Sequence, residues 1–277
     1  MASLALPAMP PTPARTRIAP TPSGYLHEGN AVNILLVRWL ADDLGASVAL
    51  RIDDLDPDRC RPAYVQDVFE VLTWLEVAWD SGPVDADDFH AHHSLQGRQQ
   101  AYWTEAMRLV GSGHAYACTC SRREGSGSCV ADCRLQGHAL QSGHSALRLA
   151  IPPGTVIEVD GTAIDLRADM GDPIIWRRDG LAAYHLASVI EDRDHGITHV
   201  VRGEDLRSSS ALHVYLGGLI GIDGSVDYRH HPLVEDIDGR KLSKSQLRTG
   251  PMPRTEQMRD RVHAAASRLA PHIGLSR

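Results

Sequence analysis

The chain has 277 residues, a formal net charge of −7 and a hydrophobic content of 43%. This length suits one large domain, or one domain with an insert, and the composition is that of a globular rather than a disordered protein. No apolar run approaches the length of a membrane span, and the proline-broken start lacks the basic region of a signal peptide, so we interpret residues 1–14 as a flexible tail and expect a cytoplasmic protein without a membrane.

The first part of the chain alternates short apolar strands with amphipathic helices. Residues 15–19 and 47–52 are strand candidates. A helix between them is indicated by apolar residues at helical spacing, followed by Gly45 as a stop signal: Val32, Leu35, Leu36, Trp39, Leu40 and Leu44. Pro62 begins a second amphipathic helix. This rhythm predicts a parallel sheet with crossover helices, the first half of a Rossmann-like α/β domain over residues 15–115.

The middle of the chain changes in character. A helix is predicted near residues 97–110, and residues 117–145 are rich in Cys, Gly and Ser. Two hairpins are indicated next, around Asp160-Gly161 and around Asp179-Gly180. We therefore predict an insert over residues 116–180.

The α/β rhythm then resumes over residues 181–236, with a helix from Tyr184, a strand at 197–201 and a helix near 208–220. Residues 237–277 remain as a loop and a short C-terminal helical segment. Residues 240–277 contain nine basic and two acidic residues, a local charge of +7, which leaves −14 for residues 1–239. Such a basic end can hold a polyanion, although a solvated arginine-rich helix has the same charge.

Two segments have the features of a phosphate site. Residues 16–30 lead from a strand through a Pro/Gly turn to His27 at a helix start, where the helix dipole favours an anion and Gly29 permits close approach. Both lysines of the protein, Lys241 and Lys244, lie within four residues, and the other 26 basic residues are arginine. A compact ammonium on a flexible stem suits a charge that moves. For residues 16–30, the alternative is a loop shaped by Pro and Gly in which His27 only caps the helix. For the two lysines, the alternative is that they lie close together by coincidence.

Four of the five cysteines lie close together in the sequence. They form a CxC pair and a CxxxC pair, which suits a tetrahedral Zn²⁺ site: Cys118, Cys120, Cys129 and Cys133. Disulfides are the alternative, but thiols stay reduced in the cytosol. We predict structural zinc and interpret Cys60 as a packing residue.

The motifs in combination resemble the paired signatures of class I aminoacyl-tRNA synthetases, which here read HEGN at residues 27–30 and KLSKS at 241–245. Residues 17–24 (RIAPTPSG), 50–59 (LRIDDLDPDR) and 201–205 (VRGED), together with Tyr184, look like the glutamyl group. Only 32 residues follow the second signature. This short plan is similar to the glutamyl-queuosine tRNA(Asp) synthetase family.

The resemblance implies activation of L-glutamate with ATP and Mg²⁺, then transfer of glutamate to queuosine in tRNA(Asp). It implies a glutamate site at Arg17, Thr21, Asp53, Tyr184 and Arg202. It implies ATP binding by His27, Gly29, Asn30 and Lys244, and catalysis by His27, Asn30, Lys241 and Lys244. Arginines suit carboxylates because they donate paired N–H bonds. The related family also has zinc at the cysteine cluster. We expect a monomer.

Three positions depart from the family pattern. Glu28 replaces an apolar residue in the first signature, Asp53 is one methylene shorter than the usual glutamate, and His185 stands where an amide side chain is usual. They leave room for a paralogue that passes an aminoacyl adenylate to a non-tRNA acceptor, and for a catalytically inactive zinc-bearing RNA-binding module. Retention of the signature residues and of both arginines argues against the inactive module.

Overall fold

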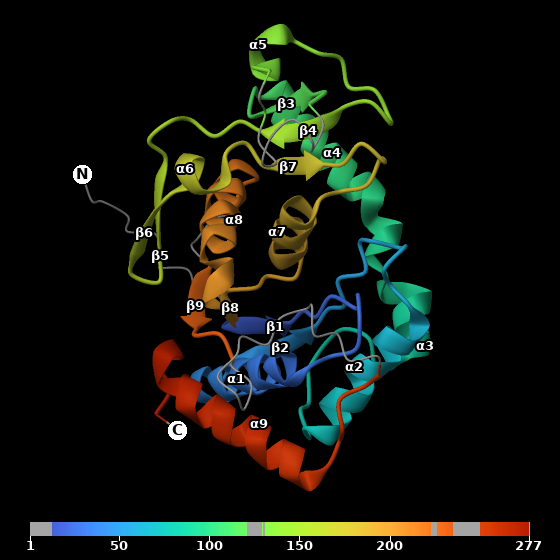
Figure 1. The fold of residues 1–277 in the computed structure, drawn as a ribbon, viewed down its shortest axis with the longest axis vertical. Helices are drawn as coiled ribbons and strands as arrows, with labels where there is room; N and C mark the ends of the chain where they lie inside the picture. Colours follow the sequence, from blue (N-terminus) through green and yellow to red (C-terminus); the bar gives the residue numbers. More distant parts are fainter. Residues whose placement is uncertain (1–12, 121–128, 130, 223–225, 235–249, 277) are drawn as a thin grey trace, which may run out of the picture.

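The computed structural model describes residues 13–120, 129, 131–222, 226–234 and 250–276 (Figure 1). At its centre lies a parallel sheet. Strand β1 (Arg15–Ile18) pairs with β2 (Ser47–Leu50), and β8 (His199–Gly203) pairs with β9 (Asp227–His231). The N–H of Thr198, next to β8, donates to the carbonyl of Arg15 at 2.8 Å, so the two pairs lie side by side in the order β2-β1-β8-β9. This arrangement confirms the predicted Rossmann-like α/β class.

Helices connect the parallel strands. Helix α1 (Glu28–Leu44) links β1 to β2, and α8 (Arg207–Leu219) links β8 to β9. Helix α1 ends where predicted, because Gly45 adopts the left-handed conformation with φ of +61°. Helix α2 (Pro62–Trp74) starts at its proline, and α7 (Tyr184–Asp194) starts at Tyr184. The helices bury their apolar faces and so complete the core.

A second sheet lies beyond one end of the central sheet, at the top of Figure 1. Its strands are antiparallel in the order β3-β4-β7: β3 (Ala115–Cys118), β4 (Ala146–Leu149) and β7 (Ile174–Trp176). The hairpin of β5 (Val156–Val159) and β6 (Thr162–Asp165) turns at Asp160 and Gly161, both with positive φ, as predicted. The second expected hairpin forms a short antiparallel pairing around Gly180, with a bridge between Trp176 and Ala182 and backbone hydrogen bonds from Arg177 to Leu181 and from Ala183 to Ile175, before α7 begins.

The remaining elements are two long helices, α4 (Gln99–Gly111) and α9 (Glu256–Leu269), and several short helices and turns. Helix α4 runs from the central sheet to the second sheet, and α9 packs along α1 (Figure 1). Helix α9 is the predicted C-terminal helical segment. The shorter elements are α3 (Ala86–Asp88), a π turn (Phe89–His93), α5 (Cys133–Gln136), α6 (Leu166–Met170), and 3₁₀ turns at Leu95–Arg98, Glu204–Leu206 and Ala270–Ile273. Among the helices described, none is long and apolar enough to cross a membrane.

Candidate functional site

Three buried arginines lie at the carboxyl ends of the central strands, where open α/β sheets bind their ligands. Arg17 is in β1, Arg51 directly follows β2 and Arg202 is in β8, and each is at most 7% exposed. Asp192 of α7 connects two of them. Its Oδ1 accepts from Arg17 Nε at 3.0 Å and from Arg51 Nη1 at 2.7 Å.

Arg51 is held from two sides. Its Nε and Nη2 donate to the two oxygens of Asp53 at 2.6 and 3.1 Å, and Nη2 also donates to Ser188 Oγ at 3.2 Å. Burial alone would lower the pKa of Arg51, but Asp53 and Asp192 raise it well above its usual value. Both oxygens of Asp53 therefore already have a cationic partner, which was not expected for a residue predicted to hold the substrate ammonium.

The cluster has an excess of positive charge. Burial would raise the pKa of Asp192, yet Arg17, Arg51 and Arg202 together keep it below the usual value, so this group is a carboxylate. Three guanidinium groups thus face two buried carboxylates, those of Asp53 and Asp192. Among the residues that the structure describes, one positive charge of this cluster remains uncompensated, and an anionic ligand can neutralise it.

Arg202 makes few contacts with neighbouring polar groups. Its Nη2 donates to Nδ1 of His213 at 3.5 Å, and its guanidinium lies 5.0 Å from the ring centre of Tyr228. Its Nη1 is buried and has no hydrogen-bond partner among the residues described. That N–H group is available to a ligand, since a buried donor without a partner is unfavourable.

Two histidines continue from Arg202 towards Tyr184. Burial, with a contribution from Arg202, lowers the pKa of His185 to about 4, and the same effects lower that of His213. Both rings are therefore neutral at pH 7. Because Arg202 can only donate, Nδ1 of His213 accepts, and its Nε2 donates to Nδ1 of His185 at 3.2 Å. His185 then carries its proton on Nε2 and presents an N–H, as an amide would.

The first signature forms the start of α1. His27 is the N-cap, and its backbone N–H donates to Oδ1 of Asn30 at 3.0 Å, so the Asn30 side chain fixes this helix start. A Cβ at Gly29 would lie 3.1 Å from the His27 ring. Glycine at this position thus makes room for the imidazole itself.

The negative charge of Glu28 is paired. Its Oε2 accepts from Nη2 of Arg261 in α9 at 3.0 Å. The basic C-terminal helix thereby compensates the acidic residue in the first signature. This departure from the family pattern is matched by a partner 233 residues further along the chain.

The other predicted site residues differ in their placement. Tyr184 lies at the start of α7, with its ring centre 5.6 Å from that of His213, so it borders the Arg202 side of the cluster. Thr21 is exposed, in a turn held beside Asp53 by a 2.9 Å bond from the Asp53 N–H to the Pro20 carbonyl. Lys241 and Lys244 lie outside the described residues.

Sequence reasoning missed four members of the cluster: Arg51, Ser188, Asp192 and His213. A signal for two of them existed. Tyr184, Ser188 and Asp192 are spaced by four residues, so they share one face of α7. Arg51 lies within the segment LRIDDLDPDR at residues 50–59, but nothing in its local sequence distinguishes it from a surface arginine.

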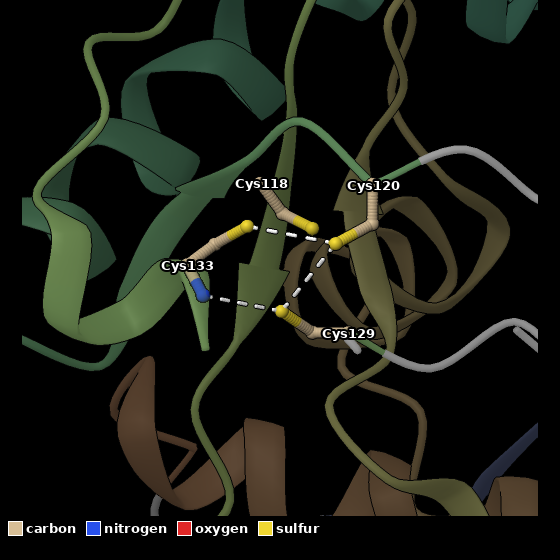
Figure 2. Close-up of side chains that lie close together, drawn as sticks. All are labelled: Cys118, Cys120, Cys129 and Cys133. Atoms are coloured by element: carbon tan, nitrogen blue, oxygen red, sulfur yellow. Dashed lines mark hydrogen bonds between the residues drawn. The ribbon is translucent and has the colours of Figure 1, made fainter. Parts of the chain in front are cut away.

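The four predicted zinc ligands converge (Figure 2). Their sulfur atoms all lie within 4.8 Å of one another: Cys118, Cys120, Cys129 and Cys133. Cys120 Sγ is 3.9 Å from Cys129 Sγ and 3.6 Å from Cys133 Sγ, and the four cysteines form no disulfide with one another. A tetrahedral Zn²⁺ with Zn–S bonds of about 2.3 Å requires sulfurs about 3.8 Å apart. The cluster therefore fits a metal ion of this type.

The surroundings of the cluster are suited to thiolates. The backbone N–H of Cys133 donates to Cys129 Sγ at 3.4 Å, and Arg148 Nε donates to Cys118 Sγ at 3.2 Å. Arg178 donates to the carbonyls of Thr119 and Cys120 and so ties the ligand loop to the turn after β7. Such outer contacts orient metal ligands.

Comparison with known proteins gives consistent relatives. The catalytic-domain model of class I tRNA synthetases (E and Q) matches residues 13–126 and 125–258. The glutamyl-Q tRNA(Asp) synthetase of Pseudomonas aeruginosa is 40% identical over 244 residues, covering 86% of this chain and 79% of the relative. The enzyme of that name from Pseudomonas fluorescens is 39% identical over 236 residues, covering 83% and 75%.

The fold has solved counterparts. A crystal structure of a glutamate tRNA ligase from Elizabethkingia meningosepticum, in complex with its amino acid, superposes with a TM-score of 0.67 at 24% identity. The match covers 84% of this chain and 52% of that one, so the chain spans about half the length of the solved ligase. The likeness shows the shared fold.

Proposed function

The chain belongs to the glutamyl-Q tRNA(Asp) synthetase family of class I tRNA synthetases, which are ligases, and we propose that it activates L-glutamate with ATP and transfers it to the queuosine base of tRNA(Asp). ATP, glutamate and tRNA are the substrates that the family implies. The proposed acceptor, queuosine in tRNA(Asp), is more specific than the family's general activity, and it is supported by the name of the relatives.

The observation that carries the proposal is the charge of the arginine cluster. Glutamate has two carboxylates and one ammonium, a net charge of −1. Within the described part of the chain, the cluster offers one uncompensated positive charge and an Arg202 Nη1 without a hydrogen-bond partner. Arg17 and Arg202 would bind carboxylates, with Thr21 and Tyr184 at the border. The ammonium would contact Asp53, or Oδ2 of Asp192, which is buried and has no hydrogen-bond partner among the described residues.

Adenylate formation needs positioning and charge stabilisation more than covalent help. The glutamate α-carboxylate attacks the α-phosphate of ATP and pyrophosphate leaves, with Mg²⁺ bound to the nucleotide. His27, Gly29 and Asn30 at the start of α1 would contact the ATP phosphates. Lys244 would follow the phosphates, and Lys241 would position the loop. The activated glutamyl group then passes to queuosine and AMP leaves.

The cysteine cluster would hold a structural Zn²⁺. Four thiolates give a closed tetrahedral site with no open position for a substrate, which is typical of a structural rather than a catalytic metal. Its contribution would be to hold β3 and α5 together at the start of the insert. We propose no chemical step at this site.

The decisive experiment is ATP–pyrophosphate exchange across the amino acids, with and without tRNA, followed by transfer of labelled glutamate. We expect exchange with glutamate in the absence of tRNA, and transfer to tRNA(Asp) that contains queuosine but not to tRNA(Asp) that lacks it. Exchange only with another amino acid, such as aspartate or glutamine, would overturn the assignment. Exchange without transfer would instead favour a paralogue with a different acceptor.

A further inference from the structure

A cavity of about 570 Å³, whose lining includes none of the three cluster arginines, lies between α4, the loop before β4 and the turn after β7. Its size is that of a small-molecule site. Two tryptophans line it, Trp103 of α4 and Trp176 of β7, with ring centres 4.9 Å apart and planes tilted by 59°. Trp176 is 7% exposed, while Trp103 is partly exposed. The cavity therefore has an accessible aromatic ring supported by a second one.

The polar lining is suited to a planar ligand. Oε1 of Gln99 accepts from the Ala182 N–H at 2.9 Å, which fixes the orientation of this amide. Its Nε2 is then buried without a hydrogen-bond partner in the described part of the chain. Because an unpaired buried donor is costly, Nε2 is suited to a carbonyl oxygen or ring nitrogen of a ligand.

Two arginines on this wall are held in place, and one of them is paired with a carboxylate. Arg177 Nε donates to both oxygens of Asp179 at 3.1 and 3.0 Å, and Arg178 is fixed by its bonds to the Thr119 and Cys120 carbonyls. Guanidinium planes stack on nucleobases, and they also attract a phosphate backbone.

Two contacts tie the cavity wall to segments that carry the proposed glutamate site. Gln99 holds Ala182, two residues before Tyr184, and Nη1 of Arg177 lies 3.9 Å from Asp56, three residues after Asp53. An RNA that places its reacting nucleotide at the arginine cluster would therefore bring neighbouring nucleotides over this wall.

We propose that the cavity receives an unpaired nucleobase of the RNA acceptor, stacked on Trp103 and hydrogen-bonded by Gln99 Nε2. The choice of RNA rests on the proposed function. The aromatic rings, the free amide donor and the two arginines are features of sites that bind single-stranded nucleic acid. A base flanking the reacting nucleotide would be unstacked from its neighbours to enter.

The test is equilibrium binding of a fluorescently labelled anticodon stem-loop RNA of tRNA(Asp). Loss of one stacking contact corresponds to a dissociation constant about fivefold to a hundredfold higher. We expect a loss in this range for Trp103→Ala and Trp103→Leu, and near wild-type binding for Trp103→Phe, which keeps an aromatic face. Trp39→Ala, which removes a half-buried tryptophan on α1 beside His263, is the matched control and should bind as wild type.

Gln99→Glu tests the amide. Glutamate keeps an acceptor for the Ala182 N–H but lacks the donor, so RNA binding should weaken. The loss should persist at high salt, where repulsion between the new charge and RNA is screened. An RNA duplex without a loop should compete poorly.

Three outcomes would overturn the cavity proposal: wild-type binding by Trp103→Ala, equal weakening by Trp39→Ala, or equal competition by the duplex. If Trp103→Ala does not fold, the Trp103→Leu and Trp103→Phe pair decides. Pyrophosphate exchange with glutamate is measured separately on the wild-type protein, to test the proposed function independently of the cavity. If exchange occurs but Trp103 proves irrelevant to RNA, the cavity proposal fails and the proposed function stands. If exchange fails, the RNA-binding series still decides the cavity.

Discussion

Arg51 lies between Asp53 and Asp192 and is only 7% exposed. Without Arg51, both buried oxygens of Asp53 lose the guanidinium that donates to them, and breaking a buried ion pair in this way typically costs about 3–5 kcal/mol. We predict that Arg51→Met lowers the free energy of unfolding by this amount, measured by urea denaturation. Arg38→Ala is the control, because Arg38 pairs with Asp42 at the surface and should lose no more than about 1 kcal/mol. Equal small losses in both variants would mean that Arg51 does not organise the cluster.

Replacing Lys244 tests whether the protein needs an ammonium group, rather than a guanidinium, at this position. If Lys244 follows the phosphates, Lys244→Arg should lower kcat of pyrophosphate exchange by about 10²–10³, although the charge is kept, because a guanidinium is planar and bulkier. The KM for ATP should change little, as expected for a contact made mainly in the transition state. Lys241→Arg should be milder. Near wild-type exchange by Lys244→Arg would make the lysine pair an accident of composition.

His185 makes stability depend on pH. Burial and Arg202 lower its pKa to about 4 in the folded protein, whereas an unfolded histidine titrates near 6.5. Between these values the unfolded chain binds more protons, so stability falls as the pH falls from about 6.5 to 4, by at most about 1.4 kcal/mol per pH unit for this group. His185→Gln removes the titration. Its unfolding free energy should therefore fall less steeply than that of the wild type over this range, and parallel curves would contradict the buried neutral imidazole.

At the scale of elements, α9 and the start of α1 form a charge-paired unit through Arg261 and Glu28. Arg261→Ala should change stability by no more than about 1 kcal/mol, since Arg261 is 45% exposed. It should nevertheless raise the KM for ATP in exchange, because Glu28 would then repel the phosphates. The double variant Glu28→Gln/Arg261→Ala should restore the KM. If the single variant leaves the KM unchanged, the Glu28 charge does not reach the nucleotide.

Strands β3 and β4 show why an element can escape sequence reasoning. All four residues of β4 are buried, and Arg148 among them breaks the apolar run that indicates a buried strand. Arg148 is tolerated because its Nη1 donates to the Asp172 carbonyl at 2.7 Å and its Nε to Cys118 Sγ. Both partners are supplied by distant segments. By contrast, α1 was predictable because its apolar period and its glycine stop are local.

At the scale of the whole molecule, the cysteine cluster joins β3, the loop that follows it and α5. We predict about one Zn²⁺ per chain, and a lower metal content together with a lower melting temperature for Cys118→Ser and Cys133→Ser. Cys60→Ser is the matched control, since Cys60 packs in the core around α1 and α2 instead. It should keep its zinc. Metal-free wild-type protein with an unchanged melting temperature would contradict a structural site.

The sequence by itself determined the α/β class, the helix starts at Pro62 and Tyr184, and the cysteine set. These depend on spacing, turn residues and caps that act within a few positions. The tertiary structure decided how the buried charges are partnered. Arg51 meets Asp192 across 141 residues, and Glu28 meets Arg261 across 233. Such pairs depend on how α7 packs over the sheet and α9 along α1, and no local rule of the chain specifies that packing.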